Sequence, residues 1–118
     1  MKTKVTIKDI EWTFFVIDDN FYEKIYGKDS HGITIKDDLA VYIKKSSLSK
    51  KLIIHELFHT YVSSCCVNSM TELHSSDMEE ISAEIVEFHL DDIANHSKKI
   101  YNRLSRDLKK EAESKGKQ

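Results

Sequence analysis

The sequence predicts an α+β fold in which a small antiparallel sheet is followed by helices, all within one domain of residues 1–118. Residues 1–45 contain short segments of β-branched and aromatic side chains separated by turn-forming residues, which is typical of three or four strands. Residues 46–113 instead carry apolar residues at helical spacing, and residues 114–118 form a tail. Hydrophobic residues make up 40% of the chain, so one core of useful size is available.

Four segments of the N-terminal part are expected to form two hairpins. Residues 4–7 and 12–17 flank a turn-tolerant Lys-Asp pair at positions 8–9. Residues 33–36 and 40–44 alternate apolar and polar side chains on either side of a second turn. The order of these strands in the sheet does not follow from the sequence.

A short helix is expected between the two hairpins, over residues 21–26. Asp18, Asp19 and Asn20 offer N-cap side chains before it, and Gly27 stands at the position that often ends a helix.

The most informative stretch is an apolar segment that contains His55, Glu56 and His59 at the spacing H-E-x-x-H. No glycine or proline interrupts it, and we expect a helix over residues 48–65, with Ser46, Ser47 and Ser49 as N-cap candidates. Two histidines four residues apart lie on one face of a helix, about 6 Å apart along its axis, so both imidazoles can bind one ion.

The surroundings of this motif predict a buried helix, because apolar residues flank the polar triplet on nearly all sides. Three unpaired polar side chains in a core would cost several kcal/mol, and a bound metal ion removes that cost. We therefore expect Zn²⁺ bound by His55 and His59, with Glu56 as the catalytic base that acts on a water. The alternative is a metal-free protein in which the histidines are core residues hydrogen-bonded to carboxylates.

A zinc site needs a third protein ligand. The continuation H-E-x-x-H-x-x-G-x-x-H is a poor option here, because Val62 and Cys65 stand where its glycine and third histidine would be. A carboxylate from a second helix is the better choice.

Three glutamates near the start of that second helix are candidates for the third ligand. Glu79 follows Ser76 by three residues, so its side chain is expected to accept a hydrogen bond from the Ser76 amide in a capping box. Glu80 has no such local partner and lies in the first turn, where the helix dipole favours a carboxylate, so Glu80 is our predicted ligand. Glu84 lies one turn further and is suited to accept the second N–H of a ligating histidine. Glu79, Glu84 and the loop residue His74 remain alternatives.

The apolar pattern of the second helix continues to position 108, and the sequence leaves open whether it is one helix or two, broken near His96 and Ser97. This amphipathic C-terminal part can pack on the protein's own core, bind a partner's groove or form a homodimer. Candidates for stabilising an oxyanion are Tyr42, Tyr61, His74 and Tyr101.

Composition narrows the expected partners and location. The net charge is -2 and no basic run dominates, so we expect no nucleic-acid partner. No apolar run approaches the roughly 18 residues of a membrane span, and the first residues lack a signal-peptide core, so we expect no membrane partner. We expect Cys65 and Cys66 to be reduced thiols, because two adjacent cysteines rarely form an unstrained disulfide. The predicted location is cytoplasmic, with a protein or peptide as substrate.

The motif at residues 55–59, followed by E-I-S-A-E at residues 80–84, resembles the H-E-x-x-H … E-x-x-A-(N/D) pattern of the gluzincin metallopeptidases. The small ImmA/IrrE-like group and short phage-encoded proteins are the most similar. The resemblance covers roughly residues 32–93, with two departures: Glu84, where the family usually has Asn or Asp, and a short spacer between the motifs.

This resemblance implies a zinc peptidase that acts on a regulatory protein of a phage or mobile element. It also matches residues 40–44 with the family's edge strand, beside which an extended substrate lies. Some relatives are non-catalytic, which gives the alternative function: a zinc-fold binding module that sequesters or inhibits a protein partner.

Overall fold

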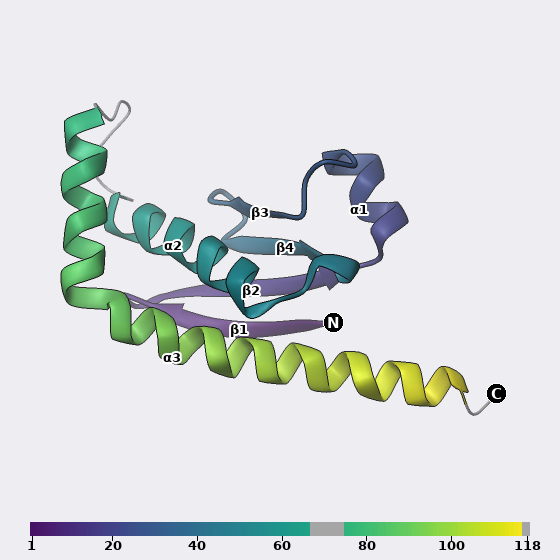
Figure 1. Ribbon diagram of the computed structural model, residues 1–118. Helices are drawn as coiled ribbons and strands as arrows, with labels where there is room; N and C mark the ends of the chain where they lie inside the picture. The colour runs from purple at the N-terminus through teal and green to yellow at the C-terminus, as the bar shows by residue number, and fades with distance from the viewer. Residues whose placement is uncertain (67–74, 117–118) are drawn as a thin grey trace.

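The computed structural model describes residues 1–66 and 75–116, and it confirms the α+β fold, with a four-stranded sheet followed by long helices (Figure 1). In chain order, the elements are β1 (Lys2–Ile7), β2 (Ile10–Ile17), α1 (Asp19–Tyr26), β3 (Gly32–Ile35), β4 (Ala40–Lys44), a 3-10 turn (Lys45–Ser47), α2 (Lys50–Cys66) and α3 (Ser75–Gly116). Residues 114–116, expected to belong to a tail, continue α3.

The sheet has the strand order β1-β2-β4-β3 and is mixed, whereas we expected an antiparallel sheet. Both predicted hairpins are present as antiparallel pairs, but β2 and β4 pair in parallel. Parallel neighbours need a crossover connection, and the chain makes one here through α1 and β3. The expectation that residues 40–44 form the edge strand is therefore wrong: β4 is paired on both sides, and β3 is the edge strand next to it, with β1 at the opposite edge.

The turn between β1 and β2 has positive φ at both central residues, 49° at Lys8 and 66° at Asp9. A two-residue hairpin turn of this kind favours glycine at its second position, because a side chain there is strained. We expect Asp9→Gly to raise the free energy of unfolding by about 0.5–1 kcal/mol, measured by urea denaturation. Asp38→Gly is the control, since Asp38 has no positive φ, and an equal gain there would contradict this explanation.

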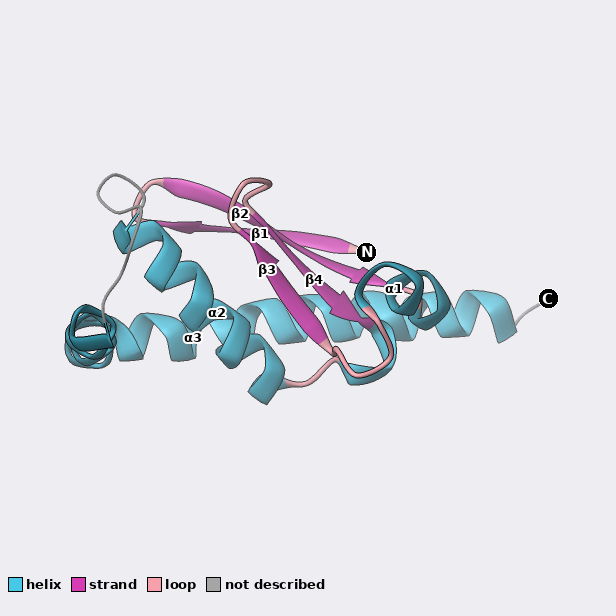
Figure 2. Cartoon of the chain, turned by 90° about the horizontal axis from the view of Figure 1, so that it is seen from above, coloured by secondary structure: helices cyan, strands magenta, loops and turns pink. Residues whose placement is uncertain are grey.

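One face of the sheet carries the core, and α2 and α3 cover it (Figure 2). Alternate residues of β2, Trp12, Phe14 and Val16, are buried, as are Val41 and Ile43 of β4. The helices contribute a second set of buried residues: Ile53, Leu57 and Tyr61 from α2, and Ile85, Ile93, Ile100 and Leu104 from α3.

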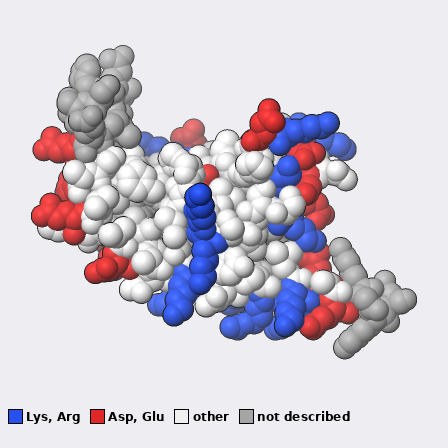
Figure 3. Space-filling model, in the orientation of Figure 1, with Lys and Arg blue, Asp and Glu red and all other residues white. Residues whose placement is uncertain are grey.

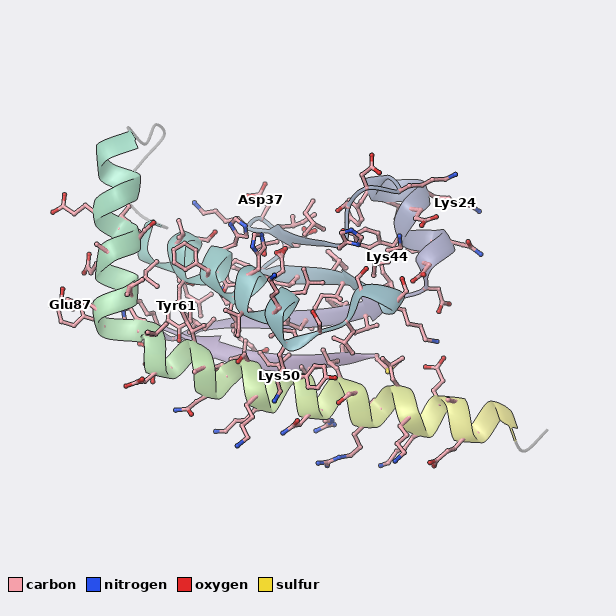
Figure 4. All side chains as sticks on the ribbon, in the orientation of Figure 1. Lys24, Asp37, Lys44, Lys50, Tyr61 and Glu87 are labelled. Atoms are coloured by element: carbon pink, nitrogen blue, oxygen red, sulfur yellow. The ribbon has the colours of Figure 1, made fainter. Side chains whose placement is uncertain are left out.

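Helix α3 is continuous from Ser75 to Gly116 and bends sharply, so that two arms meet near Glu87 (Figures 1 and 4). We call residues 75–87 the first arm and residues 93–116 the second arm. The first arm stands at the C-terminal end of α2, and the second arm runs beside β1. The sequence had left open one helix or two, and the structure has one bent helix.

The second arm packs on the protein's own core through Ile93, Ile100 and Leu104. Within the described part of this arm, no large hydrophobic side chain is left exposed. The apolar face that suggested a homodimer through the C-terminal helix is therefore already used inside the chain.

Charge is divided along α3. Residues 75–92 contain acidic side chains and no Lys or Arg, whereas residues 98–110 contain six basic residues. Figure 3 shows the acidic side chains of the first arm at the left edge, and along the lower edge basic side chains with acidic ones among them. Across residues 1–66 and 75–116, no helix combines the length and the apolar character that a membrane crossing requires.

Candidate metal centre

Helix α2 presents the two histidines of the H-E-x-x-H motif to solvent on one side and its apolar stripe to the core on the other. The helix begins at Lys50, two residues later than expected, and the Ser49 hydroxyl accepts a hydrogen bond from the Leu52 amide (3.1 Å), so Ser49 is the N-cap. Ile53 and Leu57, one turn apart, are fully buried, whereas the neighbouring Ile54 is 43% exposed. The expectation of a helix buried on all sides is therefore wrong, because the sheet covers only one face.

His55 and His59 lie side by side at the surface. Their Nε2 atoms are 3.2 Å apart, and the ring centroids are 4.8 Å apart. Two nitrogens that bind one tetrahedral zinc ion at about 2.0–2.1 Å lie about 3.3 Å from each other. This separation suits two ligands of one ion, and it also suits a hydrogen bond between the two rings. Both side chains are exposed, which the alternative of core histidines did not predict.

Glu56 lies beneath the histidines, between α2 and the edge strand β3. Only 3% of the residue is exposed, and its Oε2 accepts a hydrogen bond from the Thr34 hydroxyl at 2.8 Å. A β-carbon placed on Gly32 would be 3.4 Å from Oε1, so glycine at this position leaves space beside the carboxylate. Thr34 and Gly32 are residues that our sequence reasoning missed, since nothing in a local strand pattern identifies the helix residue it will face.

Two cavities adjoin at this site. One, of about 330 Å³, lies between β3 and α2 and is lined by Thr34, His55, Glu56 and His59. The other, of about 460 Å³, extends toward the N-terminal end of α2. They share Gly32, His55 and Glu56, so we treat them as one groove that runs along the edge strand.

A tyrosine lies behind one end of this groove. The Tyr22 and Ser30 hydroxyls are 2.6 Å apart, and Ser30 lines the larger cavity. Burial raises the pKa of Tyr22, the bond to Ser30 opposes this shift, and the negative charge of Glu56 adds to it. Tyr22 therefore stays a neutral phenol at physiological pH.

The predicted third ligand, Glu80, forms no metal-binding group with the histidine pair among the described residues. Glu80 and Glu84 are exposed on the first arm, whose buried residue is Ile85. Among the described residues, no three His, Cys, Asp or Glu side chains form a group that could hold a metal ion. His74 and the side chain of Glu79 lie outside the described part of the chain, as does the capping box at Ser76. Glu80 as a ligand therefore stays a prediction.

None of the described oxyanion candidates lines the groove. Tyr42 stacks on Phe15 at 5.2 Å between ring centroids, on the sheet face away from α2. Tyr61 is buried against His89, and Tyr101 lies under the ammonium of Lys50 (Figure 4).

Comparisons of this chain with known protein families, with curated proteins and with solved structures find no match. The resemblance to gluzincin peptidases therefore rests on the motif residues of the sequence alone.

Proposed function

We propose that this chain is a zinc-dependent peptidase that hydrolyses a peptide bond in a protein or peptide bound along β3. The observation that carries the proposal is the 3.2 Å separation of the His55 and His59 Nε2 atoms, which suits one tetrahedral ion. Glu56 supports it, because its carboxylate borders the same groove as the two imidazoles. A structural zinc site would not need a carboxylate at this position.

The chemistry would be divided between the ion and Glu56. Zinc held at this site would act as a Lewis acid and lower the pKa of a bound water to about 7. Glu56 would accept the proton of the attacking water and then return it to the leaving amine. The hydrogen bond from Thr34 occupies Oε2 and so leaves Oε1, on the Gly32 side, as the atom available for the proton.

The substrate would bind as an additional strand at the β3 edge. The amide of Lys44 donates to the carbonyl of His31 (3.0 Å), so this pair is hydrogen-bonded in the β3–β4 ladder. Because antiparallel pairs alternate, the backbone N–H and C=O groups of Gly32 and Thr34 point away from β4, toward the open edge. An extended peptide can pair with those groups while its scissile bond lies over the histidines. The proposed docking strand is therefore β3 and not residues 40–44, because β4 is already paired on both sides.

The biological setting of the proposal rests on the resemblance to ImmA/IrrE-like and phage-encoded proteins. It suggests a substrate among the regulatory proteins of a phage or mobile element, and a cytoplasmic location is proposed from the sequence.

Metal content tests the proposal directly. Protein purified without added metal is expected to contain about one zinc per chain by elemental analysis, and His55→Ala and His59→Ala should each remove it. His31→Ala is a matched control, because His31 also lines the groove but is not part of the pair. Glu80→Ala tests the third ligand separately. Absence of zinc from the wild type, even after zinc is added back, would overturn the proposal.

A second candidate is a non-catalytic zinc-fold module that binds a partner along the same groove. The observations that favour it are that the described residues bring no third ligand to the histidine pair and that none of the described tyrosine candidates for stabilising an oxyanion lines the groove.

A further inference from the structure

The groove extends beyond the histidine pair into a polar end. The larger cavity continues past His55 and Glu56 to Ser47, Ser49 and Lys51. Among the described residues, Glu56 is the one acidic residue that lines it, and its carboxylate already accepts a hydrogen bond from Thr34. The rest of this end offers hydroxyl groups and positive charge, a lining suited to an anionic group.

The lysine at this end has no ion-pair partner among the described residues. Lys51 is exposed and forms no ion pair within residues 1–66 and 75–116. Lys50, its neighbour in the same turn of α2, points the other way, with its ammonium 5.8 Å from the centroid of the Tyr101 ring (Figure 4).

The position of these lysines is unfavourable for the helix itself. Both lie in the first turn of α2, which contains no acidic residue. The positive end of the helix dipole favours acidic side chains there and disfavours lysine. Residues that are unfavourable for local structure, such as lysine in the first turn of a helix, are expected beside a functional groove when function requires them there. An anion bound next to Lys51 would offset the unfavourable charge.

A second side chain is held at the rim of the same cavity. His31 Nδ1 lies 2.8 Å from the Ser47 hydroxyl, which orients the ring. The His31 carbonyl accepts a hydrogen bond from the Lys44 amide, and this bond holds the backbone of His31 against β4. His31 comes directly before β3 and Lys51 comes from α2, so the two line one cavity from different elements.

We propose that Lys51 and His31 form a carboxylate-binding subsite, so that the peptide docked along β3 carries a carboxylate on the Gly32 side of the reacting bond. This inference rests on the proposed peptidase function and adds the substrate class. The carboxylate is an Asp or Glu side chain or the C-terminus of the peptide. A peptide antiparallel to β3 would place its C-terminal part at this end, because β3 runs from Gly32 away from the subsite.

Peptide binding tests the subsite. The probes are fluorescein-labelled decapeptides of alternating Val and Thr, measured by fluorescence anisotropy, with mass spectrometry to show that they stay intact. The first form contains a single Gln and has an amidated C-terminus, so that the peptide part carries no charge. The second form is a series in which Gln is replaced by one Glu, placed at a different position in each peptide. A third form keeps Gln and ends in a free carboxylate. We expect a carboxylate form to bind about three- to fivefold more tightly than the neutral form.

The variants identify the residue responsible. Lys51→Gln should remove the gain and Lys51→Glu should reverse it, whereas Lys50→Gln should keep it. A gain for the Glu forms alone identifies a side-chain carboxylate, and a gain for the free terminus alone identifies the C-terminus. Equal affinity of all forms, or a gain that survives Lys51→Gln, would overturn the inference. If the protein nevertheless holds zinc and binds every form, the subsite alone has failed; if no form binds, docking along β3 fails with it.

Discussion

Replacing Glu56 by Gln is expected to abolish peptide hydrolysis while zinc content stays at about one ion per chain. The amide keeps the size of the side chain but cannot accept the proton of the attacking water. Loss of a general base lowers rates by about 10²- to 10⁴-fold. The measurement combines mass spectrometry of a peptide pool incubated with each protein and elemental analysis of the same preparations.

Glu11→Gln is the matched control for this change. Glu11 is an exposed carboxylate on β2 that pairs with Lys4 at 3.3 Å, so its removal should leave both cleavage and zinc content unchanged. Cleavage that persists in Glu56→Gln would show that Glu56 is not the base. Loss of zinc together with cleavage would show instead that Glu56 helps to hold the ion. If the wild type binds zinc but cleaves nothing, the binding module becomes the better description.

The largest effect on stability is expected from Trp12→Ala. Trp12 is completely buried on the covered face of the sheet, and its indole N–H donates a hydrogen bond to the Ser64 hydroxyl of α2 at 3.1 Å. Truncating such a side chain costs about 3–5 kcal/mol, because the apolar transfer energy is lost and a cavity remains. A small domain is stable by only about 5–15 kcal/mol, so this variant should lose a large share of its free energy of unfolding.

Urea denaturation followed by far-ultraviolet circular dichroism is the suitable measurement, since Trp12 is the sole tryptophan and its fluorescence would be lost. Trp12→Phe provides the comparison: it keeps most of the apolar volume and loses the hydrogen bond, so about 1–2 kcal/mol is expected. A loss below about 1 kcal/mol in Trp12→Ala would contradict the complete burial of Trp12 in the core.

The local elements were predictable because each depends on residues close together in the chain. The H-E-x-x-H spacing determines that His55 and His59 share a helical face, and the Lys-Asp turn at positions 8–9 joins adjacent strands. The parallel pairing of β2 with β4 is different, since it depends on where α1 returns the chain. No alternation pattern contains that information, and the edge strand was misassigned as a result.

The candidate site was predictable to the same extent. Glu56 and the histidines follow from one motif, but their partners come from distant segments. Thr34 reaches Glu56 only because β3 is the edge strand beside α2. Our choice of Glu80 rested on capping within its own helix, whereas the bend of α3 and the burial of Ile85 determine which way that arm faces.

The packing of the second arm beside β1 affects how the chain folds during synthesis. Ile100 and Leu104 belong to the same core cluster as Val5 and Ile7. The core packing of β1 is therefore completed only after a helix almost a hundred residues further along the chain has been synthesised. Until that helix leaves the ribosome, the nascent sheet exposes an apolar face and an unpaired edge, the features that promote aggregation. Contacts between such distant segments also slow folding. A newly made chain should therefore depend on chaperones more than its small size suggests.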